Sequence, residues 1–72
     1  MNRFNADKLL LSKWTAVAPI DRQKHFIVTE LVRDETDQHV VSCMLEAVIN
    51  KRLFPIDCSD LKDSQFWLQG WK

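Results

Sequence analysis

The chain has 72 residues, and its ten basic and ten acidic side chains give a formal net charge of zero. A chain this short builds one hydrophobic core, so we expect a single domain over residues 1–72. The zero net charge disfavours nucleic acid as a partner, because nucleic-acid-binding domains usually carry a basic excess. A single glycine excludes the glycine-rich loops that cradle phosphates.

The N-terminal residues predict a short helix. Asn5 is suited to cap a helix over residues 6–11, and the negative charge of Asp7 suits the first turn. The three leucines at 9–11 are far too few for a signal-peptide core or a membrane span. We therefore expect an unprocessed, cytoplasmic protein with no membrane partner, and the two cysteines agree with a reducing compartment.

Four later segments are rich in β-branched and aromatic residues and are predicted to form antiparallel strands: residues 13–18, 25–33, 40–50 and 52–56. The acidic run at 34–38 is predicted to be a hairpin loop between the second and third of them. Asn50 and Lys51 are expected to form a two-residue turn, with Asn50 taking positive φ. Pro55 then belongs at a position that makes no ladder hydrogen bond or on a sheet edge.

The longest apolar run, residues 40–50, is predicted to be the central strand. Read with a period of two, one of its faces is entirely apolar: Val41, Cys43, Leu45, Ala47 and Ile49. A free cysteine on that face behaves as a small hydrophobe. The opposite face is mixed, and we expect the tryptophan-bearing C-terminal tail to cover it.

Ser64 is a suitable cap for a last short helix over residues 65–69, ended by Gly70. Together the elements predict a mainly β fold, a four-stranded antiparallel curled sheet or SH3-like half-barrel with short helical turns at both termini. The alternative is a flat sheet with the C-terminal helix across one face. Either sheet leaves edges open to pairing, so we expect a monomer or an edge-paired homodimer.

Few residues suggest chemistry. Four potential metal ligands lack a C-x-x-C pair and lie on different segments: His25, His39, Cys43 and Cys58. His39 and Cys43 would be about 13 Å apart along a strand, too far for one metal. The acidic run at 34–38 lacks the glycine and distal glutamate of a calcium loop. We expect no catalytic residue, no metal and no cofactor, and therefore no enzyme.

The tryptophans are the most informative residues, and two interpretations are open. Trp14, Trp67 and Trp71 are either core residues or partly exposed anchors that contact a partner with help from Lys13 and Lys51. The exposed alternative makes the chain a small non-catalytic protein-interaction module with an unknown protein partner. The second hypothesis is a weak single-stranded nucleic-acid-binding domain that uses exposed tryptophan with lysine or arginine.

Three parts of the chain together resemble a small family of tryptophan-rich bacterial proteins of unknown function. They are LLLSKWTAVAP at 9–19 followed by KHFIVTE at 24–30, LEAVINKR at 45–52, and LKDSQFWLQGW at 61–71. The resemblance implies that the chain is a complete protein and that the tryptophan positions are a family feature. It implies no activity, cofactor or catalytic residue. Members commonly have an aromatic residue near the position of Cys58, which this chain lacks.

Overall fold

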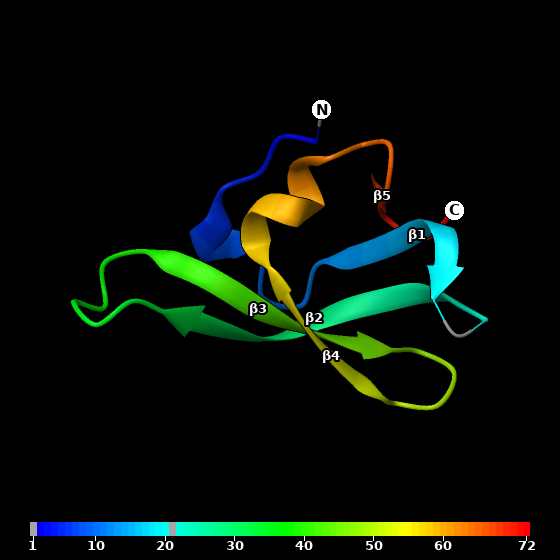
Figure 1. Ribbon diagram of the computed structural model, residues 1–72, viewed down its shortest axis with the longest axis horizontal. Helices are drawn as coiled ribbons and strands as arrows, with labels where there is room; N and C mark the ends of the chain where they lie inside the picture. The colour runs from blue at the N-terminus through cyan, green and yellow to red at the C-terminus, as the bar shows by residue number, and fades with distance from the viewer. Residues whose placement is uncertain (1, 21) are drawn as a thin grey trace.

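The strands of the chain pair into one antiparallel sheet (Figure 1). The computed structural model describes residues 2–20 and 22–72, with only the backbone of Ile20, and within these residues the sheet has five strands. Their order is β4-β3-β2-β1-β5, with bounds β1 Lys13–Ile20, β2 Gln23–Arg33, β3 Val40–Ala47, β4 Leu53–Asp57 and β5 Trp67–Gln69. The described part also has two 3-10 helices, η1 Ala6–Lys8 and η2 Cys58–Lys62.

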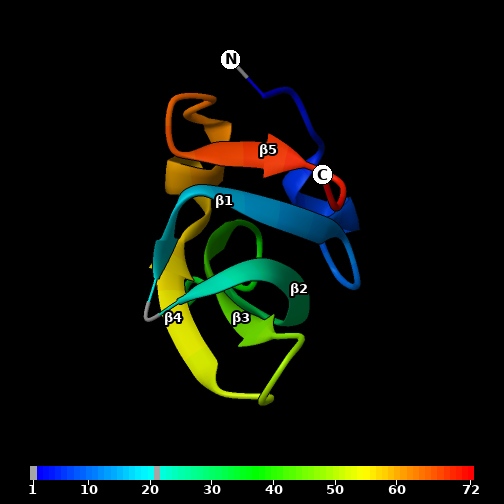
Figure 2. The ribbon, with the colours of Figure 1, turned by 90° about the vertical axis from the view of Figure 1, so that its right-hand side faces the viewer.

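The mainly β, antiparallel fold expected from the sequence is confirmed, but two of its details are wrong. The described chain has a fifth strand, β5, beyond the four expected. The second helical turn, η2, lies between β4 and β5 and not at the C-terminus. Figure 2 shows a strongly curved sheet. The sheet is not closed into a barrel, because β4 and β5 remain its two edges in the residues that the structure describes.

β1 continues through Pro19 to Ile20, two residues farther than predicted. Its first half pairs with β2, the register then breaks after Thr15, and pairing resumes at Ile20 opposite Gln23. Pro19 lies in the interval between these pairs, where its missing N–H removes no bond of the ladder. Of the residues that connect β1 to β2, the structure describes Arg22, which has a positive φ of 66°.

β2 and β3 form the long hairpin at the centre of the sheet, and each contains a β-bulge. The register passes over Thr29 on β2 and over Val41 on β3, so each is an extra residue without a partner across the pair. The bulge at Thr29 shifts the alternation of β2, so Leu31 packs on the core side with Phe26 and Val28. A strict period of two places Leu31 on the opposite face.

The bulge in β3 also corrects the predicted apolar face of the central strand. Cys43, Leu45 and Ala47 are buried as expected. Val41 is exposed, because the bulge turns it outward, and Ile49 is exposed, because β3 ends at Ala47. The burial pattern of this strand therefore follows period two only from Cys43 onward.

The turn between β3 and β4 spans the five residues 48–52 and is not the predicted two-residue turn. The N–H of Ala47 donates to the carbonyl of Arg52 at 2.9 Å, and the N–H of Lys51 donates to that of Ala47 at 2.8 Å. Lys51, not Asn50, has the positive φ, 61°. The side chain of Asn50 instead accepts from the N–H of Arg52 at 3.0 Å. Pro55 lies on β4, an edge strand, as predicted.

The N-terminal helix is shorter than predicted. The side chain of Asn5 accepts from the N–H of Asp7 at 3.0 Å, so the predicted cap is confirmed. The helix ends at Lys8 because the chain leaves the helical path at Leu11, where φ is 66° and the N–H donates to the carbonyl of Val28 at 2.7 Å. Of the three leucines, Leu9 alone is buried.

The predicted C-terminal helix over residues 65–69 is wrong. Asp63, and not Ser64, starts a single turn: its carboxylate accepts from the N–H of Gln65 at 2.9 Å, and its carbonyl accepts from the N–H of Trp67 at 2.9 Å. The chain then becomes extended as β5, in which Trp67 pairs with Ala16 of β1. A three-residue strand is too short to give a periodic pattern of its own.

The core lies on one face of the sheet, and Figure 1 shows η1 and η2 on one side of the long β2–β3 hairpin. The rings of Phe26 and Trp67 pack edge to face with centroids 5.6 Å apart, and the ring of Phe54 packs on Phe26 at 5.8 Å. Trp67 therefore covers the core face of the sheet. The expectation that the tryptophan-bearing tail covers the mixed face of β3 is wrong for this residue. The buried residues of the cluster are Leu9, Trp14, Ala16, Phe26, Val28, Cys43, Leu45, Ala47, Leu61 and Trp67.

We predict that Phe26→Ala leaves the chain largely unfolded in water. Removing a buried phenylalanine ring costs about 3–5 kcal/mol, which is about the whole stability of a domain this small. Urea unfolding followed by circular dichroism measures the change. The matched control is Phe66→Ala, which removes an exposed ring and should change the free energy of unfolding by less than about 0.5 kcal/mol. Equal unfolding midpoints for the two variants would contradict the assigned core.

We predict that the thiol of Cys43 is protected from reagents in the folded protein. Burial, with a smaller contribution from Cys58, raises the pKa of Cys43 to about 11, and the thiolate is the reactive form. In a Cys58→Ser variant, reaction with Ellman's reagent should be slow at pH 8 and should accelerate as the pH approaches 11. Denaturant should abolish the protection. A rate at pH 8 equal to that of the unfolded chain would contradict this prediction.

Candidate functional site

Two of the three tryptophans proposed as partner contacts are core residues. Trp14 is 1% exposed, its indole N–H donates to the hydroxyl of Ser12 at 2.8 Å, and its ring packs edge to face on Phe4. Trp67 is also buried, against Phe26. The interpretation as core residues therefore holds for these two side chains, and a partner has no access to the ring of Trp14.

Trp71 is different, because it lies across the sheet and remains 44% exposed. Its indole N–H donates to the carbonyl of Phe26 at 3.0 Å. The ammonium of Lys13 lies 4.7 Å from its ring centroid, and the ring of His25 lies 6.1 Å away. The structure thus brings Trp71 and Lys13 together as a cation–π pair. Lys51, the other predicted cation, lies in the turn between β3 and β4.

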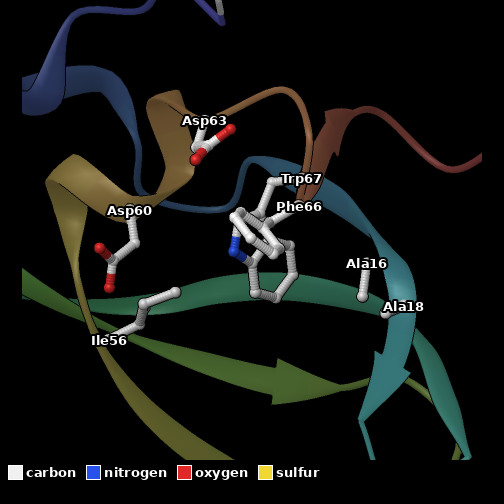
Figure 3. A pocket seen from close by; sticks show the side chains of 7 residues that line it. All are labelled: Ala16, Ala18, Ile56, Asp60, Asp63, Phe66 and Trp67. Atoms are coloured by element: carbon white, nitrogen blue, oxygen red, sulfur yellow. The ribbon is translucent and has the colours of Figure 1, made fainter.

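A pocket lies where β1, β4, η2 and the start of β5 meet, and its volume is about 330 Å³. Figure 3 shows its side chains converging from these elements, with the rings of Phe66 and Trp67 between the two alanines of β1 and the isoleucine of β4. The lining residues are Ala16, Ala18, Ile56, Asp60, Asp63, Phe66 and Trp67. We call this the seam pocket, because it lies between β1 and the edge strand β4.

Local structure explains why the seam pocket is open. Ala16 and Ala18 present only methyl groups, so the β1 wall is thin. The break in the β1–β2 register between Thr15 and Ile20 lets this part of β1 bend away from β2. The N–H of Val17 donates to the carbonyl of Phe66 at 2.9 Å, which fixes Phe66 beside the opening. Phe66 is 59% exposed there.

The seam pocket combines an apolar interior with a negative rim. Asp60 and Asp63 are three positions apart in and just after η2, and Figure 3 shows both carboxylates on the η2 side of the pocket. Both residues are exposed, so both carboxylates stay hydrated. An apolar surface edged by carboxylates favours an apolar group with a positive charge beside it.

Our sequence reasoning missed every residue of this pocket except Trp67. Two signals were present: the i, i+3 spacing of Asp60 and Asp63, which places side chains on one face of a helical turn, and the adjacent aromatic pair Phe66–Trp67. Neither signal is specific. Ala16 and Ala18 line the pocket because β1 bends there, and no pattern in the sequence predicts that bend.

The candidate metal ligands do not form a cluster. In residues 2–20 and 22–72, no group of three or more histidine, cysteine or acidic side chains could hold a metal ion. His25 packs beside Trp71, and the thiol of Cys58 donates to the carbonyl of Val40 at 3.1 Å. In the acidic loop, hydrogen bonds from the Thr36 hydroxyl and the Gln38 N–H lower the pKa of Asp34. The described chain also has no helix of sufficient length and apolarity to cross a membrane.

Comparison with known proteins agrees with the resemblance that the sequence suggested. The model of a family described as tryptophan-rich protein (DUF2389) matches residues 12–72. None of the curated proteins and none of the solved structures matches the chain significantly. The match covers both ends of the sheet, from the residue before β1 to the last residue after β5, and it includes all three tryptophans. The chain therefore belongs to the tryptophan-rich protein family DUF2389.

Proposed function

We propose that this chain is a small, non-catalytic protein-interaction module that binds a segment of a partner protein in the seam pocket. The observation that carries the proposal is the exposed ring of Phe66 beside an apolar pocket whose floor is the buried ring of Trp67. Aromatic side chains next to a pocket are typical anchors of protein interfaces. The described lining offers carboxylates but no histidine, cysteine or serine, which favours binding over catalysis.

The rim charge specifies the partner further. Asp60 and Asp63 face a bound segment from one side of the pocket. A partner residue of medium size, such as leucine or isoleucine, would fill the apolar interior, and a neighbouring lysine or arginine would lie against the carboxylates. Each exposed ion pair of this kind contributes about 0.2–1 kcal/mol, so the apolar contact supplies most of the affinity and the charges supply selectivity.

We also propose that the curved sheet is the SH3-like half-barrel expected from the sequence and that the protein acts in the cytoplasm. The curvature of the sheet in Figure 2 and the position of the pocket between β1 and the edge strand β4 support the first point. Aromatic-lined grooves on such small β domains are a common means of peptide recognition. The free thiols of Cys43 and Cys58 suit a reducing compartment.

Selection from a random peptide display library tests the proposed function. We expect the selected peptides to share an aliphatic residue next to lysine or arginine, because the pocket is apolar and its rim is negative. The double variant Asp60→Asn, Asp63→Asn should bind a selected peptide about fivefold more weakly, equivalent to two exposed ion pairs. Binding is measured by fluorescence anisotropy of a labelled peptide.

Two further variants locate the binding site. Ala18→Leu should reduce binding because its larger side chain enters the pocket, whereas Leu11→Ala, at an exposed position outside the pocket, should leave it unchanged. Circular dichroism confirms that each variant is folded. Peptides that bind Ala18→Leu and the wild-type chain equally, or that are acidic, would overturn the assignment of the seam pocket.

A second candidate function is weak binding of single-stranded nucleic acid at Trp71. The half-exposed indole with Lys13 over its ring favours it, since aromatic faces beside cations stack on bases. Trp71→Ala should weaken binding of a mixed oligonucleotide at low salt by at least fivefold, the effect of about 1 kcal/mol of lost stacking. Trp71→Phe is the control that keeps an aromatic ring. Absence of binding, or binding that added salt does not weaken, would remove this candidate.

A further inference from the structure

The turn between β3 and β4 carries aliphatic side chains at its tip. Ile49 is 80% exposed, the highest value among the large apolar side chains in the described part of the chain, and Val48 and Leu53 beside it are also exposed. Turn tips usually carry glycine, asparagine, aspartate or serine, because such tips face water. An isoleucine held at the extreme end of a hairpin therefore needs a reason outside the fold.

The same end of the molecule is basic. The N–H of Val48 donates to the carbonyl of His25 at 3.0 Å, so the β3–β4 turn lies beside the start of β2. The charged residues described within these two turns are cations, Arg22, Lys51 and Arg52. Next to the turns lie Lys24 on β2 and one carboxylate, Glu46 on β3, opposite Leu53. By sequence the connection from β1 to β2 also contains one acidic residue, Asp21, which lies outside the described residues. We call this end, with Ile49 and Leu53, the basic tip.

The acidic loop lies at the opposite end. β2 and β3 run the length of the sheet, so the loop that joins them is remote from the turns at their other ends, as Figure 1 shows along the longest axis. That loop contains Asp34, Glu35 and Asp37. The largest extent of the molecule is 36 Å. A chain of zero net charge thus has one positive and one negative end.

We propose that the basic tip docks on the surface of an anionic phospholipid bilayer. Ile49 and Leu53 enter the boundary between headgroups and acyl chains, and the cations of the two turns contact the headgroup phosphates. Long lysine and arginine side chains reach headgroups while their apolar neighbours insert. The acidic loop then points away from the negative surface, so the two ends favour one orientation.

The shape and chemistry of the tip favour a bilayer over other anionic partners. A nucleic acid gives an exposed isoleucine no favourable contact, because an aliphatic side chain neither stacks on bases nor forms hydrogen bonds. The boundary between headgroups and acyl chains of a bilayer removes the same side chain from water. A protein partner needs a cavity matched to this convex turn, and a bilayer surface deforms around it. We expected no membrane partner because the sequence lacks a spanning segment, and docking on a surface requires none. The proposal shares no residue with the seam pocket, so the two stand or fall separately.

Flotation with vesicles tests the proposal. We expect the full-length chain to float with phosphatidylcholine vesicles that contain about 30% phosphatidylglycerol and to remain behind with phosphatidylcholine alone, because the headgroup charge differs. Ile49→Glu should reduce partitioning at least tenfold, and Lys51→Ala about fivefold. Leu11→Glu is the matched control, since Leu11 is 64% exposed outside the tip, and it should partition as the wild-type chain does.

Further measurements distinguish an anionic lipid surface from free phosphate and from a nucleic acid. Inorganic phosphate at the concentration of the vesicle headgroups should not displace the chain, because a free anion cannot bury Ile49. Salt at about 1 M, where the screening length is about 3 Å, should weaken the binding. Equal partitioning of Ile49→Glu and the wild-type chain, or no flotation with anionic vesicles, would overturn the proposal. Binding to a mixed oligonucleotide without flotation would overturn it in favour of a nucleic acid.

Discussion

The packing of Trp67 on Phe26 is the contact on which the other parts of the structure depend. β5 forms only a short ladder with β1, and a ladder of this length is marginal without side-chain burial. An aromatic side chain buries about 150–250 Å², so the indole supplies what the ladder lacks. The side-chain amide of Asn2 donates to the carbonyls of Leu61 and Trp67, which ties the N-terminal segment to the same place. The ring of Trp67 thus holds β5 on the sheet, and the backbone carbonyls of Leu61 and Trp67 anchor the N-terminal segment beside it.

The same ring gives the seam pocket its floor, so stability and binding are linked at Trp67. They are separable at the rim, because Phe66, Asp60 and Asp63 are exposed and contribute little to the core. The three tryptophans of the chain therefore have distinct environments: Trp14 is a core residue, Trp67 is a core residue beside a pocket, and Trp71 is a half-exposed ring over Lys13. Tryptophan content alone does not identify a single aromatic site.

Sequence reasoning predicted the features that depend on local chemistry. The content of β-branched and aromatic residues located the four longer strands, and the cap at Asn5 and the edge position of Pro55 followed from single residues. It failed where tertiary contacts decide. The bulge at Val41 leaves no trace in a count of period two, and β5 exists because Trp67 fits on Phe26, a contact across 41 positions of sequence. The seam pocket was missed for the same reason, since its walls come from segments far apart in the chain.

The net charge of zero was a misleading guide to the partners of this chain, because it does not show where the charged residues lie. In an antiparallel sheet of consecutive hairpins, alternate turns lie at the same end. The turn after β1 and the turn after β3 are therefore neighbours, and the latter carries Lys51 and Arg52, whereas the loop after β2 is acidic and remote from them. A total of zero then describes two opposed ends and not an electrically featureless surface. Whether a small antiparallel sheet of this kind suits a charged partner is therefore better judged from the summed charge of the turns at each of its two ends. For this chain the two sums have opposite signs.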